Sequence, residues 1–270
     1  MLLPNLAALR IGADADGEEE EVPTILELYE SGERQLRNHP EDADNRALVL
    51  AAVTFSGHEL VFAALTFRHD REIVMAAVRS HWMGLRYASE YLQDDLQVVL
   101  ASVEHAGQSL MYASERLKNL EEVVFTAAAQ DGYALAAASR RLQGNRQLVL
   151  LALRAEISDF TTLGYADLDL CDDAEIVARA VARHGEALRY ASEALQDDAQ
   201  IVMIAVQQNG NALEWASERL KNTLSIVQAA LVAPREEDEE ELSPLRFASA
   251  GMRDYFYQNP EAAPQQQQPE

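Results

Sequence analysis

The sequence Leu-Arg-Tyr-Ala-Ser-Glu-Tyr-Leu at residues 85–92 occurs three more times in nearly the same form, at residues 110–117, 188–195 and 213–220. All four copies fit the pattern Leu-x-Tyr/Trp-Ala-Ser-Glu-x-Leu, and each is part of a unit of about 25 residues. Short units repeated in tandem form stacked supersecondary structures, in which each repeat contacts its neighbours and the stack offers an extended surface. The motif therefore predicts an all-α solenoid without identifying what it binds.

The repeats can be aligned by the last apolar residue of the segment that precedes each motif or its equivalent. This marker recurs eight times, at Val53, Val78, Val103, Ala128, Leu153, Val181, Val206 and Leu231. Consecutive markers are 25 residues apart except for one step of 28 residues, between Leu153 and Val181. We place the three additional residues between Ile157 and Leu168, where we expect an altered loop or helix start. The sequence thus predicts about eight helix-turn-helix repeats.

A residue that can cap a helix begins the first helix of most repeats. Seven of the eight corresponding positions are of this kind, namely Asn45, Asp70, Asp95, Asn145, Asp173, Asp198 and Thr223, and the exception is Leu120. Their side chains can accept hydrogen bonds from the free amides of the first helical turn, and acidic residues also favour the positive end of the helix dipole. Paired aspartates such as Asp94 and Asp95 are therefore expected to be caps, because a metal site would need carboxylates from several segments.

The first helix of a repeat is expected to end at a glycine four residues after the marker. Five repeats have a glycine there, namely Gly57, Gly107, Gly132, Gly185 and Gly210. A glycine with positive φ at a C-terminal cap stops a helix and reverses the chain. His81 and His184 lie just before this turn, where a cation would stabilise the negative end of the helix dipole, so we favour capping over catalysis or metal binding for both.

The second helix is predicted to carry the motif and the candidate binding residues. At 100° per residue, Leu85, Ala88, Ser89 and Leu92 share one face of a helix, and the aromatic residue and the glutamate lie on the other side. The candidate binding residues are the aromatic Tyr87, Tyr112, Tyr190 and Trp215 and the acidic Glu90, Glu115, Glu193 and Glu218. For the aromatic row, packing between repeats is favoured over stacking on a ligand or a base. A charged row is commonly only a solvated face, but this one is the best candidate for a binding surface.

The formal net charge of −23 for 270 residues restricts the class of partner. Nearly half of the excess negative charge lies in two acidic stretches, at 14–21 and 236–241. Such a chain repels phosphate backbones and anionic lipid surfaces, so we expect neither direct nucleic-acid binding nor membrane binding. Basic proteins are the electrostatically favoured partners.

Cys171 is the only cysteine, which excludes an internal disulfide and favours a reducing compartment. The neighbouring Asp172 and Asp173 should raise the pKa of this thiol and leave it unreactive. The sequence has no run of about 18 apolar residues, no secretory signal and no transit peptide. We therefore expect a soluble intracellular protein, cytoplasmic or nuclear.

Four segments are expected along the chain. They are a disordered acidic segment at 1–22, a capping helix and linker at 23–44, the repeat domain at 45–258 with an acidic loop at 234–243, and a disordered tail rich in Pro and Gln at 259–270. The capping helix is predicted to begin at Thr24, to extend to Arg37 and to cover the exposed face of the first repeat.

Two recurring strings resemble a known family. They are Leu-Arg-Tyr-Ala-Ser-Glu-x-Leu-Gln-Asp-Asp and Glu-Ile-Val-x-x-Ala-Val-x-x-x-Gly, and they are similar to the tandem repeat catalogued as domain of unknown function 4116. The resemblance is strong over 70–119 and 173–222 and weaker over 45–69 and 145–172. The family's unit of about 50 residues would correspond to two of the repeats. The resemblance implies a helical repeat fold, and the family has no assigned activity.

Three classes of function are consistent with the sequence. The first is a protein-interaction scaffold for a basic partner, and the second is a structural or assembly subunit, with an acidic mimic of nucleic acid as a variant. The third, an enzyme, is disfavoured because the sequence has no nucleophile elbow, phosphate loop or metal-spaced set of His and Cys. No catalytic residue, metal site, cofactor or small-molecule substrate is predicted.

Overall fold

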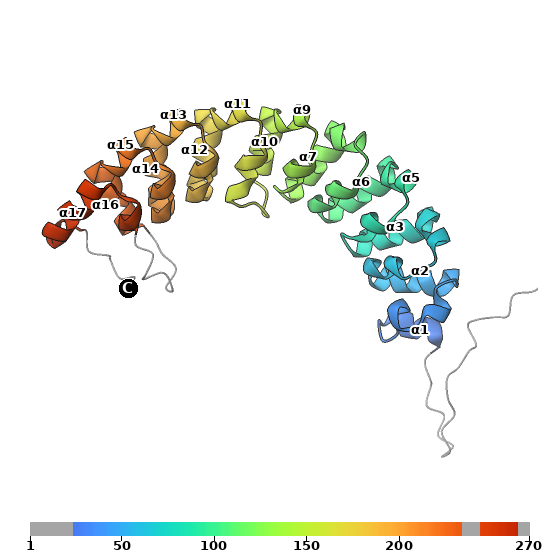
Figure 1. Cartoon of the computed structure of the whole chain (residues 1–270). Coiled ribbons are helices and arrows are strands. Elements are labelled where there is room, and N and C mark those ends of the chain that lie inside the picture. The colour runs from blue at the N-terminus through green and yellow to red at the C-terminus, as the bar shows by residue number, and fades with distance from the viewer. Residues whose placement is uncertain (1–23, 234–243, 264–270) are drawn as a thin grey trace, which may run out of the picture. The chain divides into compact units, whose positions relative to one another are not determined.

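The computed structural model describes residues 24–233 and 244–263, so the predicted disorder at 1–22 and the acidic loop at 234–243 lie outside the described residues. The chain forms two compact parts, residues 1–130 and 131–270. In each part, helices stack in the order of the sequence, which confirms the all-α repeat fold (Figure 1). Among the described residues, extended pairing is limited to one isolated bridge between Asp131 and Ile157.

The N-terminal part contains a row of long helices. They are α2 (Arg46–Phe55), α3 (Arg71–Ser80), α6 (Leu96–His105) and α7 (Glu121–Gln130), and each packs on the next. Shorter segments connect them: α4 (Gly84–Tyr87), α5 (Glu90–Gln93), and the 3-10 turns η4 (Gly57–Val61), η5 (Leu65–His69), η6 (Gly107–Tyr112) and η7 (Leu117–Asn119). Before this row lie α1 (Ile25–Glu30), η2 (Leu36–Asn38) and η3 (Pro40–Asp42).

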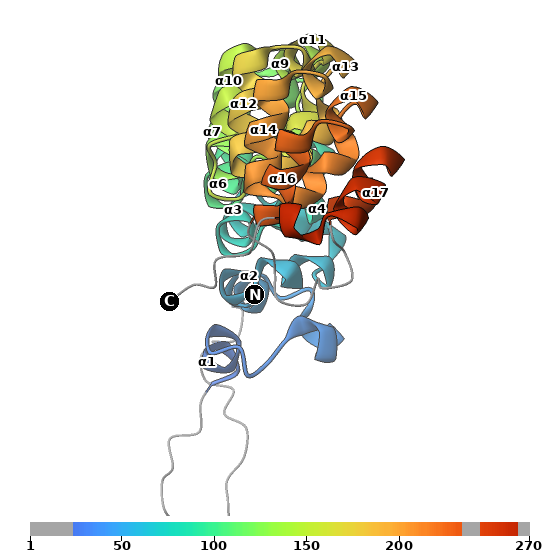
Figure 2. The same cartoon turned by 90° about the vertical axis from the view of Figure 1, so that its left-hand side faces the viewer.

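The C-terminal part has the same organisation. Its long helices are α10 (Arg146–Ala152), α12 (Ala174–Arg183), α14 (Ala199–Gln208) and α16 (Leu224–Val232). The short helices α9 (Arg140–Gln143), α11 (Leu168–Cys171), α13 (Glu193–Gln196) and α15 (Glu218–Lys221) lie along one edge of this row (Figures 1 and 2). The remaining elements are α8 (Ala134–Ala137), α17 (Ala250–Gln258), η8 (Phe160–Tyr165), η9 (Gly185–Tyr190), η10 (Gly210–Trp215), η11 (Pro244–Phe247) and η12 (Pro260–Ala262).

The core of a repeat joins its long helix to the leucines of its short segments. In the sixth repeat, residues 173–197, the side chains of Ile176, Val177, Val181 and Leu188 are fully buried. Burial of each such side chain contributes roughly 1.5–3 kcal/mol. The apolar markers that define the period in the sequence are therefore the core of the stack.

Six of the seven proposed caps are confirmed. Asn45, Asp70, Asp95, Asn145, Asp173 and Asp198 each accept hydrogen bonds from two backbone amides of the helix that follows. The prediction is wrong for Thr223, whose hydroxyl donates instead to the carbonyl oxygen of Arg219 at 3.0 Å. A hydroxyl that turns back toward the preceding helical turn no longer faces the free amides.

The prediction that glycines with positive φ end the long helices is wrong. Among the described residues only Gly32 has a positive φ, of 80°. The long helices end instead at an extended residue just before the glycine position, such as Ser56, His184 or Asn209. The glycine is required by packing: a Cβ at Gly57, Gly185 or Gly210 would overlap a backbone carbonyl oxygen of the next long helix.

His81 is one of these extended residues, and it does not act as the expected cation. Burial lowers the pKa of its imidazole, and the nearby His58 and His105 lower it further. Its Nδ1 accepts a hydrogen bond from the amide of Met83 at 3.1 Å. The neutral ring therefore shapes the turn, while the equivalent His184 also occupies the extended position at the end of α12.

The second helix of the repeat is not continuous, contrary to the prediction from helical periodicity. The motif alanine has extended backbone angles in all four copies, and so does the serine at 89, 192 and 217: Ala88 has φ −65° and ψ 156°, and Ser89 has φ −65° and ψ 155°. The motif thus consists of a helical or 3-10 turn, an extended dipeptide and a second short helix that begins near the glutamate. The repeat contains three segments rather than two helices.

The extended dipeptide joins consecutive repeats by a backbone hydrogen bond. The amide of Ser89 donates to the carbonyl oxygen of Arg68 at 2.9 Å, and Ser192 and Ser217 donate in the same way to Cys171 and Gln196. A continuous helix would use these amides internally. The break in the motif therefore lets each repeat satisfy a carbonyl group at the end of the one before it.

The fifth repeat, residues 145–172, is the irregular one. Its long helix α10 ends at Ala152 after seven residues, whereas α12 has ten. The connection from Leu153 to Asp159 then replaces the single extended residue of regular repeats. The three additional residues thus lie in the connection from Leu153 to Asp159, which overlaps only the start of the predicted range from Ile157 to Leu168, and they follow a shortened helix.

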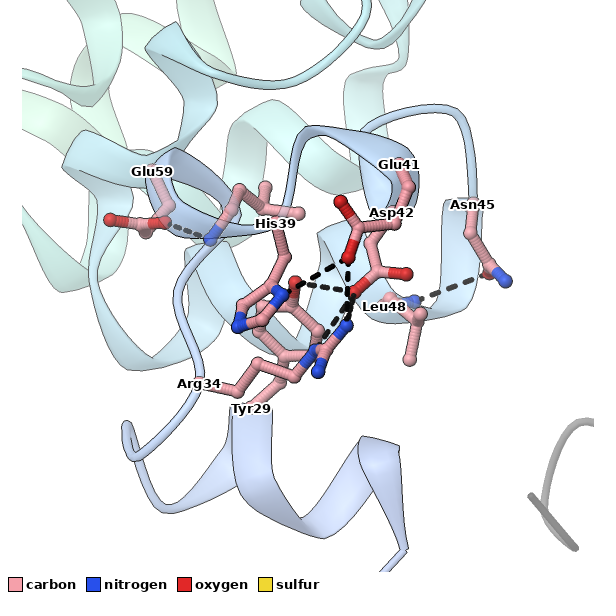
Figure 3. A network of polar contacts seen from close by, with 9 residues as sticks. Tyr29, Arg34, His39, Glu41, Asp42, Asn45, Leu48 and Glu59 are labelled. Carbon is pink, nitrogen blue, oxygen red and sulfur yellow. Dashed lines mark hydrogen bonds and ion pairs between the residues drawn. The ribbon is translucent and has the colours of Figure 1, made fainter. Parts of the chain in front are cut away.

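The N-terminal cap is shorter than predicted. Thr24 caps α1 through a capping box, but the helix ends at Glu30 and Gly32 turns the chain, so no helix extends to Arg37. Helix α1 packs on α2, as expected for a cap of the first repeat. Asp42 fixes it by accepting hydrogen bonds from the Tyr29 hydroxyl at 2.9 Å and from Arg34 Nη2 at 2.7 Å (Figure 3).

The tail prediction needs one correction. Residues 259–263 are described and form η12, and the Gln228 side chain donates to the carbonyl oxygen of Ala262 at 3.1 Å. This part of the proposed disordered tail therefore packs on the last long helix. Residues 264–270 lie outside the described residues.

Candidate protein-binding surface

The apolar residues of the motif are used by the core. The first leucine of each motif, at 85, 110, 188 and 213, is fully buried, and the motif alanines are between 5% and 8% exposed. These residues pack the short segments against the long helices, so they are not available to a partner.

The motif aromatic residues lie half-buried between repeats. In the sixth repeat the guanidinium of Arg189 lies 5.6 Å from the ring centre of its own neighbour Tyr190 and 5.1 Å from that of Trp215 in the next repeat. Arg86 occupies the same place between Tyr87 and Tyr112, at 5.9 Å from each ring centre. A cation over two aromatic faces stabilises the junction. The aromatic row therefore consists of rings that alternate with arginines rather than an open stacking platform.

In three of the four motifs the serine hydroxyl links its repeat to the aspartate pair of the preceding one, whereas the Ser89 hydroxyl has no such partner. The hydroxyl of Ser217 donates to Asp197, and Arg219 Nε also contacts this carboxylate at 3.0 Å. Ser114, Arg116 and Asp94 repeat this arrangement. The serine hydroxyl first, and then the guanidinium, hold the pKa of the aspartate below its usual range. Of each Asp-Asp pair, only the second side chain thus caps the start of the following helix, and the first aspartate ends the preceding short helix and links two repeats.

The motif glutamates, Glu90, Glu115, Glu193 and Glu218, are exposed in every copy. Glu90, Glu193 and Glu218 are the first residues of α5, α13 and α15, where a carboxylate favours the helix dipole, and Glu115 lies in the turn before η7. Glu115 and Glu218 are 89% and 83% exposed, and they contact Lys118 and Lys221 at 2.9 and 3.0 Å. Glu90 and Glu193 have glutamine in place of that lysine, so no described cation pairs with them.

The glutamines after the motif are committed to the fold. Gln93 Nε2 donates to the carbonyl oxygen of Leu85, and Gln196 Nε2 to that of Leu188, both at 3.1 Å. Their side chains turn inward and close the short helix on the preceding turn. Glu90 and Glu193 are therefore the motif carboxylates with the least internal compensation.

Three cavities of the described part, near α1, between α10 and α12, and around Arg34 and Glu59, contain none of the candidate binding residues. One hollow of about 590 Å³ lies between α1 and α2 and is lined mainly by apolar residues, including Leu26, Leu50 and Phe55. A group of His39, Glu41 and Asp42 is close enough to share a metal ion. Because Tyr29 and Arg34 already bond and neutralise Asp42, we interpret this group as the network that holds α1 (Figure 3).

Sequence reasoning missed the arginines and the first aspartate of each pair. Their signals are present in the sequence, because Arg precedes the aromatic residue in two motifs and the string Gln-Asp-Asp follows two of them. A periodic position alone does not show that Arg189 lies between two rings or that Asp197 contacts the next repeat. Those contacts depend on how successive repeats pack.

The geometry defines an all-α tandem repeat protein, in which similar backbone and side-chain contacts join one repeat to the next. Five tandem matches, at residues 45–93, 95–143, 145–196, 173–221 and 198–231, place this chain in the family described as Domain of unknown function (DUF4116). Every match begins at a confirmed cap residue, and the complete matches span two repeats. The overlapping matches follow because a unit of two repeats can be placed in either of two registers on a periodic sequence.

No curated protein and no solved structure matches the chain. Within the described residues, no helix combines the length and the apolar character that a membrane span requires.

Proposed function

We propose that this chain is a non-catalytic repeat protein that holds a basic protein partner along the motif glutamates. The leading alternative role, a structural subunit of a larger assembly, would use the same repeat stack, but no particular contact of the described residues favours it. The proposal concerns the chemistry of the surface and the class of partner.

The observation that carries the proposal is that the glutamate is the recurring motif residue that the fold leaves exposed, in two copies without a cation partner among the described residues. The leucines and alanine are buried, the aromatic residue packs beside an arginine, and the serine bonds to the preceding repeat. The glutamate is nevertheless present in all four copies and is exposed in each. A residue that recurs without a packing role is a candidate for recognition.

The spacing of the glutamates suits a basic segment. Contacting helices lie about 8–10 Å apart, and a polyproline II segment advances about 9 Å in three residues and returns every third side chain to the same face. Lysines or arginines at every third residue of a partner would therefore face successive glutamates of one part. The net charge of −23 would also speed the approach of such a partner.

Affinity capture from native cell extract with two matched variants tests this function. The first variant neutralises the motif glutamates (Glu90→Gln, Glu115→Gln, Glu193→Gln, Glu218→Gln). The control removes the same number of charges from exposed acidic residues elsewhere (Asp44→Asn, Glu104→Gln, Glu214→Gln, Asp254→Asn). Exposed charges contribute little to stability, so both variants should fold.

The expected result is a basic protein retained by the natural chain and by the control but lost by the motif variant. Retention should also fall between low and moderate salt, because salt screens exposed charges. Equal retention by both variants would reject the motif glutamates as the binding surface. If both variants lost the partner, the interaction would depend on the net charge of the chain and not on the motif glutamates.

A further inference from the structure

The fifth repeat contains a hollow that differs in charge from the rest of this acidic chain. The arginine hollow, of about 460 Å³, lies between α10 and α12 in the C-terminal part, and its lining residues are Leu150, Leu153, Arg154, Arg179, Ala182 and Arg183. Three arginines thus surround one small space in a chain of net charge −23.

The shortened helix α10 accounts for the space. In the sixth and seventh repeats two full-length helices, α12 and α14, pack closely along their length. Helix α10 stops at Ala152 and contacts α12 less extensively than α14 does, and Ala182 and Arg183 in the last turn of α12 are exposed. The 28-residue repeat therefore has a shortened first helix, and the arginine hollow lies where that helix is shortened.

The three arginines have different roles. Arg183 is held by the fold, because Nη2 donates to the carbonyl oxygen of Ala155 at 2.8 Å and Nη1 to that of Leu153 at 3.3 Å. Arg179 shares Glu175 with Arg146, and its Nη2 lies 3.0 Å from that carboxylate. Arg154 is exposed and has no partner among the described residues. Positive charge therefore exceeds its local compensation at this hollow.

The combination is specific to this junction. The positions equivalent to Arg154, Arg179 and Arg183 at the preceding junctions of the N-terminal part include Ala76, Arg79, Ala101, Glu104 and His105. None of those junctions has arginine at all three positions. Leu150 and Leu153 add an apolar wall, half-buried and buried respectively, beside the guanidinium groups.

We propose that the arginine hollow binds an acidic, leucine-containing segment of a partner protein. Planar guanidinium groups bind carboxylates through paired hydrogen bonds, so Arg154 and Arg179 would hold two acidic side chains. The apolar wall would take one aliphatic side chain of the same segment. A nucleic acid fits less well, because it needs positive charge along many successive phosphates. This site is independent of the motif glutamates and opposite to them in charge.

Fluorescence anisotropy with the full chain and a labelled peptide of alternating glutamate and leucine tests the site. Moderate salt should be used, because it screens the distant negative charges of the chain while close pairs persist. Arg154→Gln and Arg179→Gln should each weaken binding about tenfold, the effect of losing one charge-assisted hydrogen bond. Arg79→Gln is the matched control, because Arg79 occupies the repeat position of Arg154 outside the hollow.

Two control probes decide between acidic peptide and other ligands. They are the same peptide with glutamine in place of glutamate, which should not bind, and labelled single-stranded oligothymidylate of equal charge, which should bind more weakly. Unchanged melting temperatures of the variants would show that the fold is intact. The proposal is overturned if the natural chain does not bind the acidic peptide, if Arg79→Gln weakens binding as much as Arg154→Gln, or if either control probe binds as tightly.

Discussion

The fifth and sixth repeats each bury the leucine at the equivalent position and form the same backbone link to the preceding repeat. They differ in the connection between the long helix and that leucine. In the sixth repeat α12 has ten residues, one extended histidine follows, and Gly185 lies directly against α14. In the fifth repeat, α10 is about one turn shorter. A longer connection follows, and a capping box between Asp159 and Thr162 starts η8, which carries the leucine. Leu163 and Leu188 are then equally buried.

The contacts between repeats change together with the helix. At the position of Arg189 the fifth repeat has Gly164, and a Cβ there would lie 2.6 Å from the Tyr190 ring. Asp167 replaces the motif serine and faces Gly144, so the serine and aspartate link is absent at that junction. The amide of Asp167 still donates to the carbonyl oxygen of Gln143 at 3.0 Å. The backbone link is therefore the constant element, and the side-chain contacts vary around it.

The largest expected effect concerns the regular route. Gly185→Val should reduce the free energy of unfolding by about 3 kcal/mol, because the added side chain overlaps the carbonyl oxygen of Ala205. Gly144→Ala is the control, since a Cβ there meets nothing closer than 3.7 Å. Urea unfolding followed by circular dichroism measures both. If Gly185→Val were no more destabilising than Gly144→Ala, the close approach of glycine to the next helix would be refuted.

The irregular route depends on an arginine from the following repeat. Arg183→Ala should cost about 2 kcal/mol, because it removes hydrogen bonds to the carbonyl groups of Leu153 and Ala155. Arg179→Ala, which loses an exposed ion pair, should cost under about 1 kcal/mol. Equal costs in chemical denaturation would mean that Arg183 does not hold the connection.

The regular junction between the sixth and seventh repeats should depend on a cation between two rings. Arg189→Ala is expected to lower stability by about 1 kcal/mol, and Arg189→Lys by less, because lysine keeps the charge over Tyr190 and Trp215. Thermal unfolding monitored by Trp fluorescence reports on this site. A lysine variant as unstable as the alanine variant would point to a role of guanidinium shape instead of charge.

The smallest effect should appear on acidification. The pKa of Asp197 is held below its unfolded value of about 3.9 by Ser217 and then by Arg219, so its contribution is present above that pH and is lost as the pH falls through the lower folded-state value. Between pH 5 and pH 2, Asp197→Asn should therefore lose less stability than the natural chain. Asp44→Asn should follow the natural chain, and parallel curves for all three proteins would contradict the link.

The period, the caps and the buried leucines could be predicted because they depend on local sequence. The phase set by Val181 and Val206 also placed Asp173 and Asp198 at helix starts, which the structure confirms. The break at Ala88 and Ser89 could not be predicted from periodicity, since a continuous helix would place the same leucines on one face. It follows from a bond to a carbonyl group 21 residues earlier in the chain, at Arg68.

The candidate surfaces differ in the same way. That Glu90 and Glu193 are exposed was a local inference, and the structure places both on the surface. The arginine hollow needed the knowledge that α10 ends early and that α12 is its neighbour, because Arg154 and Arg183 lie 29 positions apart in the sequence. Only the packing of two repeats brings them together.

The backbone link between repeats has a direction, since a repeat donates through the extended dipeptide of its motif, Ala-Ser or in the fifth repeat Ala-Asp, and accepts through the end of its own last turn. Such a junction is heterologous, like the contact between subunits of an open filament, and has no symmetry that would terminate it. Copies could be added or removed in multiples of one repeat without creating a new kind of contact. Helix α1, which packs on α2, therefore covers one end of an otherwise open-ended stack.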